Sequence, residues 1–245
     1  MKSDWIWFDL DDTLIDFQAN SREAHRIVHR ECRLDRFYPS ADEWIEVYES
    51  HNRKLWDSYS RAEITQGFLR CDRFATPLLP RWDGSEEELK EFSWQLDTIY
   101  LTRLAQQTVL IDGAREILTF LRAHDYNIGV LSNGFREVQH NKLTNTGLGE
   151  MVDLVVLSDD IGVNKPDPRL YRHAMDRAGV TDPSRHTMVG DNRSTDIEGA
   201  IRSGWHAILL DPTAGALRSE SDCLVTPRLS LLEGIFGPKE CDSEC

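Results

Sequence analysis

Aspartates follow two short apolar runs of this sequence. Asp9 and Asp11 come after residues 5–8, and Asp191 comes shortly after residues 187–189. In an extended segment, Asp9 and Asp11 share a face, and two like charges placed together favour a cation. Carboxylate oxygens prefer a hard ion such as Mg²⁺, so these residues predict a magnesium site that Asp191 completes. The alternative is an ordinary acidic turn, because aspartate is common in turns.

Further polar residues lie at similar places along the chain. Ser132 and Asn133 follow the apolar run 126–131 and offer a hydroxyl and backbone N–H groups that suit a phosphoryl oxygen. Lys165 precedes a predicted helix, and positive charge is unfavourable at a helix start unless an anion is near. Asp196 lies in the first turn of a later predicted helix. Taken singly, these residues also fit an ordinary turn, a solvated loop lysine and a helix-terminal acid.

The elements that carry these residues alternate between apolar runs and amphipathic patterns. Such alternation indicates an α/β fold, a Rossmann-like parallel sheet with helices on both faces. The carboxyl ends of its strands meet at one edge, which would bring the polar residues together. Strands are predicted at residues 5–8, 126–131, 154–157, 187–189 and 206–210, and helices at 114–123, 136–146 and 168–178.

The interval between the first two strands has a helical period and no convincing strand. We therefore predict an all-helical module at residues 16–107, inserted into an α/β core formed by 1–15 and 108–245. Its aromatic residues are expected to form mostly core, whereas four histidines are expected on solvated helix faces. The aromatic residues are Trp44, Tyr48, Trp56, Tyr59, Phe68, Phe74, Trp82, Phe92, Trp94 and Tyr100, and the histidines are His25, His29, His140 and His173.

Composition limits the partners of the chain. The 245 residues include 28 Lys and Arg against 42 Asp and Glu, a net charge of −14, which argues against nucleic acid polymers and anionic membranes. No apolar run approaches a membrane span and no signal peptide is visible, so we expect a cytoplasmic protein. The five cysteines lack CxxC spacing and are expected to be free thiols; Cys241 and Cys245 lie on a polar tail.

The ordered motifs resemble those of the haloacid dehalogenase-like hydrolase superfamily. The inserted module looks like that family's first type of cap, and the residues around 131–136 and 157–163 look most like its pyrimidine 5′-nucleotidase branch. Asn192 stands where Ser is usual, and a backbone or supporting role is expected for it. The motifs are Asp9-Leu10-Asp11-Asp12-Thr13, Ser132-Asn133, Lys165-Pro166, and Gly190-Asp191-Asn192 with Asp196.

The resemblance implies hydrolysis of a phosphate ester through an aspartyl-phosphate. Asp9 would be the nucleophile, and Asp11 would protonate the leaving alcohol and then deprotonate the attacking water. Mg²⁺ would be held by the Asp9 and Asp191 carboxylates and the Asp11 carbonyl, with Asp196 acting through water or in support. Ser132, Lys165 and the backbone N–H groups of Leu10 and Asn133 would hold the phosphoryl oxygens.

The predicted substrate is a small phosphorylated metabolite, foremost a nucleoside 5′-monophosphate. A sugar-phosphate or phosphoglycolate-type phosphatase is the alternative within the same class. A 2-haloacid dehalogenase is disfavoured, because displacing halide needs no acid such as Asp11. A non-catalytic phosphate-binding regulator is disfavoured because all the chemical residues are present. No feature of the sequence predicts an oligomeric state.

Overall fold

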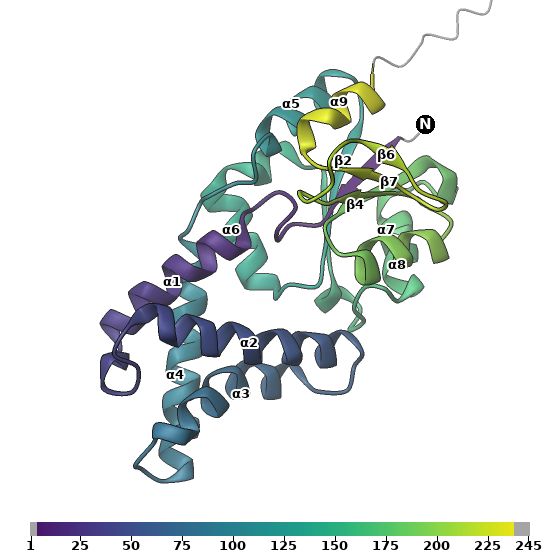
Figure 1. Cartoon of the computed structure of the whole chain (residues 1–245). Helices are drawn as coiled ribbons and strands as arrows, with labels where there is room; N and C mark the ends of the chain where they lie inside the picture. The colour runs from purple at the N-terminus through teal and green to yellow at the C-terminus, as the bar shows by residue number, and fades with distance from the viewer. Residues whose placement is uncertain (1–3, 238–245) are drawn as a thin grey trace, which may run out of the picture. The chain divides into compact units, whose positions relative to one another are not determined.

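The computed structural model describes residues 4–237 (Figure 1). The chain divides into two compact units. The first holds the residues up to Asp16 and those from Val109 onward, and the second is Phe17–Thr108. In the described part of the chain, all strands belong to the first unit and the second is built from helices.

The first unit is an α/β unit. Its strands are β1 (Trp5–Phe8), β2 (Asn127–Ser132), β3 (Leu154–Leu157), β4 (His186–Gly190), β5 (His206–Leu210), β6 (Arg218–Ser219) and β7 (Leu224–Thr226). Its helices are α5 (Ala114–Ala123), α6 (Arg136–Thr146), α7 (Pro168–Ala178), α8 (Glu198–Arg202) and α9 (Leu232–Ile235).

The sheet confirms the predicted α/β class. Its strands lie in the order β3-β2-β1-β4-β5-β7-β6. Neighbouring strands are parallel except for β6, which is antiparallel to β7. These last two strands were not predicted, because β6 has two exposed residues and β7 only three residues. So short a run carries no detectable alternation.

Alternate residues of β1 enter two separate cores. Ile6 and Phe8 pack with residues of α5, α6 and α9, whereas Trp5 and Trp7 pack with α7 and α8. Successive side chains of a strand point to opposite faces, so an apolar run without polar alternation is covered on both sides. Figure 1 shows α5 and α9 on one side of the sheet and α7 and α8 on the other.

The second unit is a ring of four helices within the described residues. Their bounds are α1 (Phe17–Glu31), α2 (Ala41–Ser60), α3 (Gln66–Leu78) and α4 (Glu86–Ala105). Each packs against two others, α1 with α2 and α4, and α3 with α2 and α4. Ser40, Thr65 and Ser85 accept a backbone N–H at the starts of α2, α3 and α4. Such caps satisfy N–H groups that have no partner inside the helix.

The core of this helical unit is aromatic, and it contains a histidine. Trp44, Tyr48, Phe74 and Tyr100 are buried there, and His25 lies among them with no exposed surface. The other six aromatic residues named above are partly or largely exposed, so the prediction that most of the ten form core was wrong. The prediction that His25 faces solvent was wrong. Its Nδ1 accepts a hydrogen bond from Trp44 Nε1 at 3.2 Å, and its ring stacks on Tyr100. This bond satisfies one ring nitrogen and lets a polar ring sit in an apolar core.

Two further expectations concern cysteines and membranes. Cys32, Cys71 and Cys223 are free, and Cys241 and Cys245 lie outside the described residues. Among residues 4–237, no helix combines the length and the apolar character needed to cross a bilayer.

Candidate active site

The pairing of β1 with β4 brings the first acidic residues together. Phe8 is in register with Val189, and the Asp9 N–H continues this pairing by donating to the Val189 carbonyl at 2.9 Å. Asp9 and Asp191 therefore emerge side by side where the two strands end. Oxygens of Asp9, Asp191 and Asp196 lie within 4.8 Å of one another.

The chain turns directly after Asp9. The carbonyl of Leu10 accepts the N–H groups of Leu14 and Ile15 at 3.0 and 2.9 Å, which closes a tight turn. Asp12 within it has a positive φ of 56°, a conformation that Asp tolerates better than most residues. Leu10 is fully buried.

Lys165 is a buried residue and not the solvated loop lysine that was the alternative. Its Nζ donates to Asp9 Oδ1 at 2.6 Å, and it reaches Asp196 Oδ1 at 2.7 Å. A third bond, at 2.8 Å, goes to the carbonyl of Leu131 at the end of β2. An ammonium group has three donors, and all three donors of Lys165 point to oxygens of the site. Lys165 thereby links three strand ends of the sheet.

Asp196 lies in a wide π-helical turn, Arg193–Ile197, that follows β4. Its Oδ2 accepts the N–H of Asn192 at 3.1 Å. Tyr171 of α7 donates to the carbonyls of Thr195 and Asp196. π-helical turns leave carbonyls without regular partners and are frequent at functional sites. The turn therefore fixes Asp196 beside Lys165.

Burial and neighbouring charges shift the pKa values of Asp9, Asp191 and Lys165. Burial raises the pKa of Asp9 well above its usual range, and Lys165 opposes this rise. Burial also raises the pKa of Asp191 to about 7, with contributions from Asp196 and Asp12. Burial lowers the pKa of Lys165, but Asp196 and Asp9 raise it by more, so it lies above its usual range. Negative charge is thus in excess at these strand ends.

Ser132 and Asn133 reach the site from β2. Ser132 is the last residue of that strand and is buried. The Asn133 side chain accepts the N–H of Lys165 at 2.7 Å and donates to the Lys165 carbonyl at 3.1 Å. Asn133 therefore also holds the Lys165 loop, a contribution that the sequence did not reveal. Asn192 acts as a helix cap, since its side chain accepts the N–H groups of Ser194 and Thr195.

Two residues of α6 at this site were missed. Lys142 Nζ lies 2.6 Å from Asp11 Oδ1, and Gln139 Nε2 donates to Asp11 Oδ2 at 2.9 Å. The available signal was their spacing, since Gln139 and Lys142 interrupt the face of the helix that also carries Val138 and Leu143. Polar residues on a buried helix face require partners.

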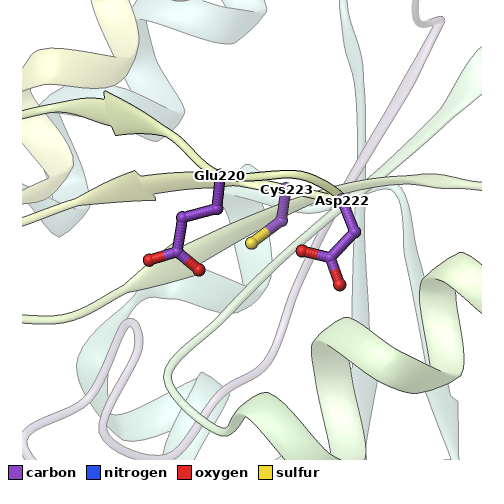
Figure 2. A group of neighbouring side chains, drawn as sticks. All are labelled: Glu220, Asp222 and Cys223. Carbon is purple, nitrogen blue, oxygen red and sulfur yellow. The ribbon is translucent and has the colours of Figure 1, made fainter.

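The described residues contain a second acidic group, at the turn from β6 to β7. Figure 2 shows Glu220 and Asp222 on either side of the Cys223 sulfur. The Glu220 carboxylate pairs with Arg193 and, at 3.0 Å, with Arg218, and Arg193 also lies 3.9 Å from Asp222. Arg193 and Arg218 therefore already balance the negative charge of Glu220 and Asp222. At the strand ends, by contrast, the three carboxylates have, among the described residues, only the Lys165 ammonium between them.

Comparison with known proteins identifies the family. A family model described as haloacid dehalogenase-like hydrolase matches residues 4–204. The chain belongs to this family. Pyrimidine 5′-nucleotidase YjjG of Escherichia coli is 32% identical over 83% of this chain and 84% of its own. Glyceraldehyde 3-phosphate phosphatase of Methanothermobacter thermautotrophicus is 29% identical, with 84% of each chain covered.

A solved structure supports the fold of this haloacid dehalogenase-like hydrolase. The magnesium-bound putative HAD-hydrolase YfnB of Bacillus subtilis superposes with a TM-score of 0.84 at 22% identity, over 96% of this chain and 99% of that one. The family match and the relatives show that the protein is an enzyme, and the superposition shows that it has the fold of this hydrolase family.

Proposed function

We propose that this hydrolase is a Mg²⁺-dependent phosphatase that cleaves small phosphate monoesters through an aspartyl-phosphate. The observation that carries the proposal is the position of Asp11. Gln139 Nε2 bonds both the Asp11 carboxylate and, at 2.8 Å, the hydroxyl of Ser132. An acid–base group is therefore one side chain away from a hydroxyl suited to a phosphoryl oxygen. A dehalogenase needs no such acid.

The residues at the strand ends fit a divalent metal ion. Asp9, Asp191 and Asp196 offer hard oxygen ligands within 4.8 Å of one another. When ionised, their three negative charges and the one positive charge of Lys165 leave a charge of −2. Asp9 and Asp191, with the carbonyl of Asp11, would hold Mg²⁺, and Asp196 would assist. The bound ion would offset charge between the nucleophile and the phosphate.

The chemistry proceeds in two steps on Asp9. Its carboxylate oxygen attacks phosphorus, the ester P–O bond breaks, and Asp11 gives its proton to the departing alkoxide. Asp11 then takes a proton from a water molecule whose oxygen attacks phosphorus. The bond to Asp9 breaks, and inorganic phosphate leaves.

The phosphoryl oxygens require compensating donors. We assign this task to the Ser132 hydroxyl, to the backbone N–H groups of Leu10 and Asn133, and to the charge of Lys165. Because Lys165 is held by Asp9, Asp196 and the Leu131 carbonyl, its contribution is mainly electrostatic.

The proposed substrate is a nucleoside 5′-monophosphate, supported by the 32% identity to the pyrimidine 5′-nucleotidase. We propose the helical unit as the cap that selects it. The aromatic residues buried in the core of that unit are unavailable for stacking on a base. Partly exposed ones remain candidates, among them Trp56, Tyr59 and the half-exposed Phe68. We also propose a cytoplasmic location, supported by the three cysteines of the described residues, which are free thiols.

A substrate panel tests this function. Phosphate release would be measured with Mg²⁺ for purine and pyrimidine 5′-monophosphates, a 3′-monophosphate, sugar phosphates and phosphoglycolate, and halide release for 2-chloropropionate. We expect the highest kcat/KM with a 5′-monophosphate. A higher value for a sugar phosphate or phosphoglycolate would select the alternative phosphatase. Halide release without phosphate release would overturn the phosphatase assignment.

A further inference from the structure

Two polar residues of α6 are buried at the site, and the proposed chemistry does not use them. Gln139 has no exposed surface and Lys142 is 3% exposed. They are three positions apart, so both side chains lie on one face of the helix. Each supplies one oxygen of the Asp11 carboxylate with a donor, Lys142 at 2.6 Å and Gln139 at 2.9 Å.

Gln139 connects Asp11 to Ser132. The amide nitrogen of Gln139 faces Asp11. This orientation suits the ionised Asp11 that acts as base in the second step, because a carboxylate only accepts hydrogen bonds. The second N–H of this amide donates to Ser132 Oγ at 2.8 Å, and the Gly134 N–H donates to the same oxygen at 3.1 Å. Since both lone pairs of the hydroxyl are then used, its hydrogen remains to be donated elsewhere. Gln139 thereby sets the direction of the Ser132 donor.

The local sequence leaves space for this arrangement. A Cβ added at Gly134 would lie 2.2 Å from Gln139 Nε2 and 2.3 Å from its Cδ. Gly134 is not among the positive-φ glycines, so its backbone would accept alanine, and the three atoms nearest to the added Cβ all belong to the Gln139 side chain. A buried ammonium such as Lys142 is costly without a carboxylate partner, and Asp11 provides one.

We infer that Gln139 and Lys142 are positioning residues that hold the Asp11 carboxylate for proton transfer to the leaving group. The inference rests on the proposed phosphatase function. General acid–base catalysis depends first on geometry, and displacement of a reacting group by about 1 Å can cost about 10²-fold in rate. Two donors from one rigid helix fix both oxygens of Asp11, which one donor alone would leave free to rotate.

The dependence of rate on the leaving group tests this role. A nucleoside alkoxide needs the proton from Asp11, whereas para-nitrophenolate departs without it. Single-turnover release of nucleoside and of nitrophenol would be compared in Gln139→Leu, Lys142→Met and Gly134→Ala, with Asp11→Asn as reference. Asn141→Ala, at an exposed position of the same helix, is the matched control.

We expect Lys142→Met to slow nucleoside release by about 10-fold or more and nitrophenol release by less than about 3-fold, following Asp11→Asn. Gln139→Leu and Gly134→Ala also disturb the Ser132 donor, so they should slow both reactions, but nucleoside release by about 10-fold more than nitrophenol release. The control should stay within about 2-fold of wild type on both esters. Gly134→Ala retains both polar residues, so it decides the matter if Lys142→Met fails to fold. Folding would be checked by circular dichroism.

Two outcomes separate this inference from the function on which it rests. If Asp11→Asn discriminates between the esters while folded α6 variants slow both equally, the positioning role is overturned and the phosphatase assignment stands. If Asp11→Asn itself does not discriminate, or wild type releases no phosphate, the proposed chemistry fails and this inference fails with it.

Discussion

At the scale of single residues, Asp9 is distinguished by its surroundings. It is buried, and its nearest cation is Lys165, at 2.6 Å. Burial raises the pKa of Asp9, and the neighbouring carboxylates Asp196 and Asp191 raise it further. An anion is costly in such a place unless a ligand compensates it, which is the expected condition of a carboxylate retained for chemistry.

Replacing Asp9 tests its proposed role as nucleophile. Asp9→Asn should lower turnover to below about one thousandth of wild type, because an amide does not form the acyl phosphate and loss of a nucleophile is among the largest single-residue effects. Phosphate release and circular dichroism would be measured together. Asp176→Asn, the same change at an exposed aspartate of α7, should retain full activity. Near-normal turnover in folded Asp9→Asn would exclude the covalent route.

At the scale of elements, the contact between β1 and β2 is close-packed. A Cβ added at Gly129 would lie 2.2–2.6 Å from atoms of the Trp7 indole, which is stacked against Trp5 and tilted against Trp205. Both residues belong to central strands that carry site residues at their carboxyl ends, Asp9 after β1 and Ser132 on β2.

Gly129→Ala should therefore lower the free energy of unfolding by about 1–3 kcal/mol, the usual cost of overpacking a core. Urea unfolding would measure it. Gly149→Ala is the matched control in the same unit, because the nearest atom to its new Cβ would be 3.5 Å away, an ordinary contact. An unchanged midpoint for Gly129→Ala would mean that the Trp7 ring shifts at little cost.

His25 gives the helical unit a predicted dependence on pH. Burial lowers its pKa well below 6.5, and the charge of Arg73 adds to this effect. Tyr48 and Tyr100 also face the ring. Because the pKa of His25 is lower in the folded than in the unfolded chain, the neutral ring stabilises the fold fully above pH 6.5. This stabilisation is lost as the pH falls towards the pKa of the folded state.

Between pH 7 and pH 5, protonation of this residue in the unfolded chain should lower the free energy of unfolding of wild type by at most about 2 kcal/mol. His25→Gln keeps an acceptor for Trp44 but cannot take up the proton. Urea unfolding of both proteins at the two pH values should therefore show a smaller loss in the variant. Equal losses would show that other groups cause the acid sensitivity.

At the scale of the whole molecule, the net charge of −14 is unfavourable for binding a phosphate, and the proposed cation at the strand ends would offset this charge locally. EDTA should abolish phosphate release, and Mg²⁺ should restore it. At about 100 times its dissociation constant, Mg²⁺ should also stabilise the fold by about 2.7 kcal/mol. Activity assays and thermal unfolding would measure the two effects independently.

Two acidic variants locate the metal. Asp191→Asn should raise the Mg²⁺ concentration needed for half-maximal activity, because it removes a ligand. Glu220→Gln should leave it unchanged, since Arg193 and Arg218 already pair with that carboxylate. The reverse pattern would place the functional ion at the β6–β7 turn, and full activity in EDTA would remove metal from the proposal.

The sequence by itself determined the α/β class and the order of the motifs. Runs such as Trp5–Phe8 are apolar on both faces, and that property is local, so it can be read without the fold. Asp9 and Asp191 stand at the ends of two such runs. Parallel pairing then places them together, because all strand ends of a parallel sheet meet at one edge.

Tertiary structure alone decided which polar groups meet. The sequence suggested a solvated His25, because one helix face in isolation does not reveal that three other helices cover it. It placed Lys165 and Asp196 at the same edge of the sheet but did not predict their ion pair. It offered no reason to join Gln139 and Lys142 to Asp11, which are 128 and 131 residues away in the chain. The hydrophobic periodicity of a sequence indicates which positions are buried. Hydrogen bonds and ion pairs depend instead on which side chains the whole fold brings within about 3 Å of one another.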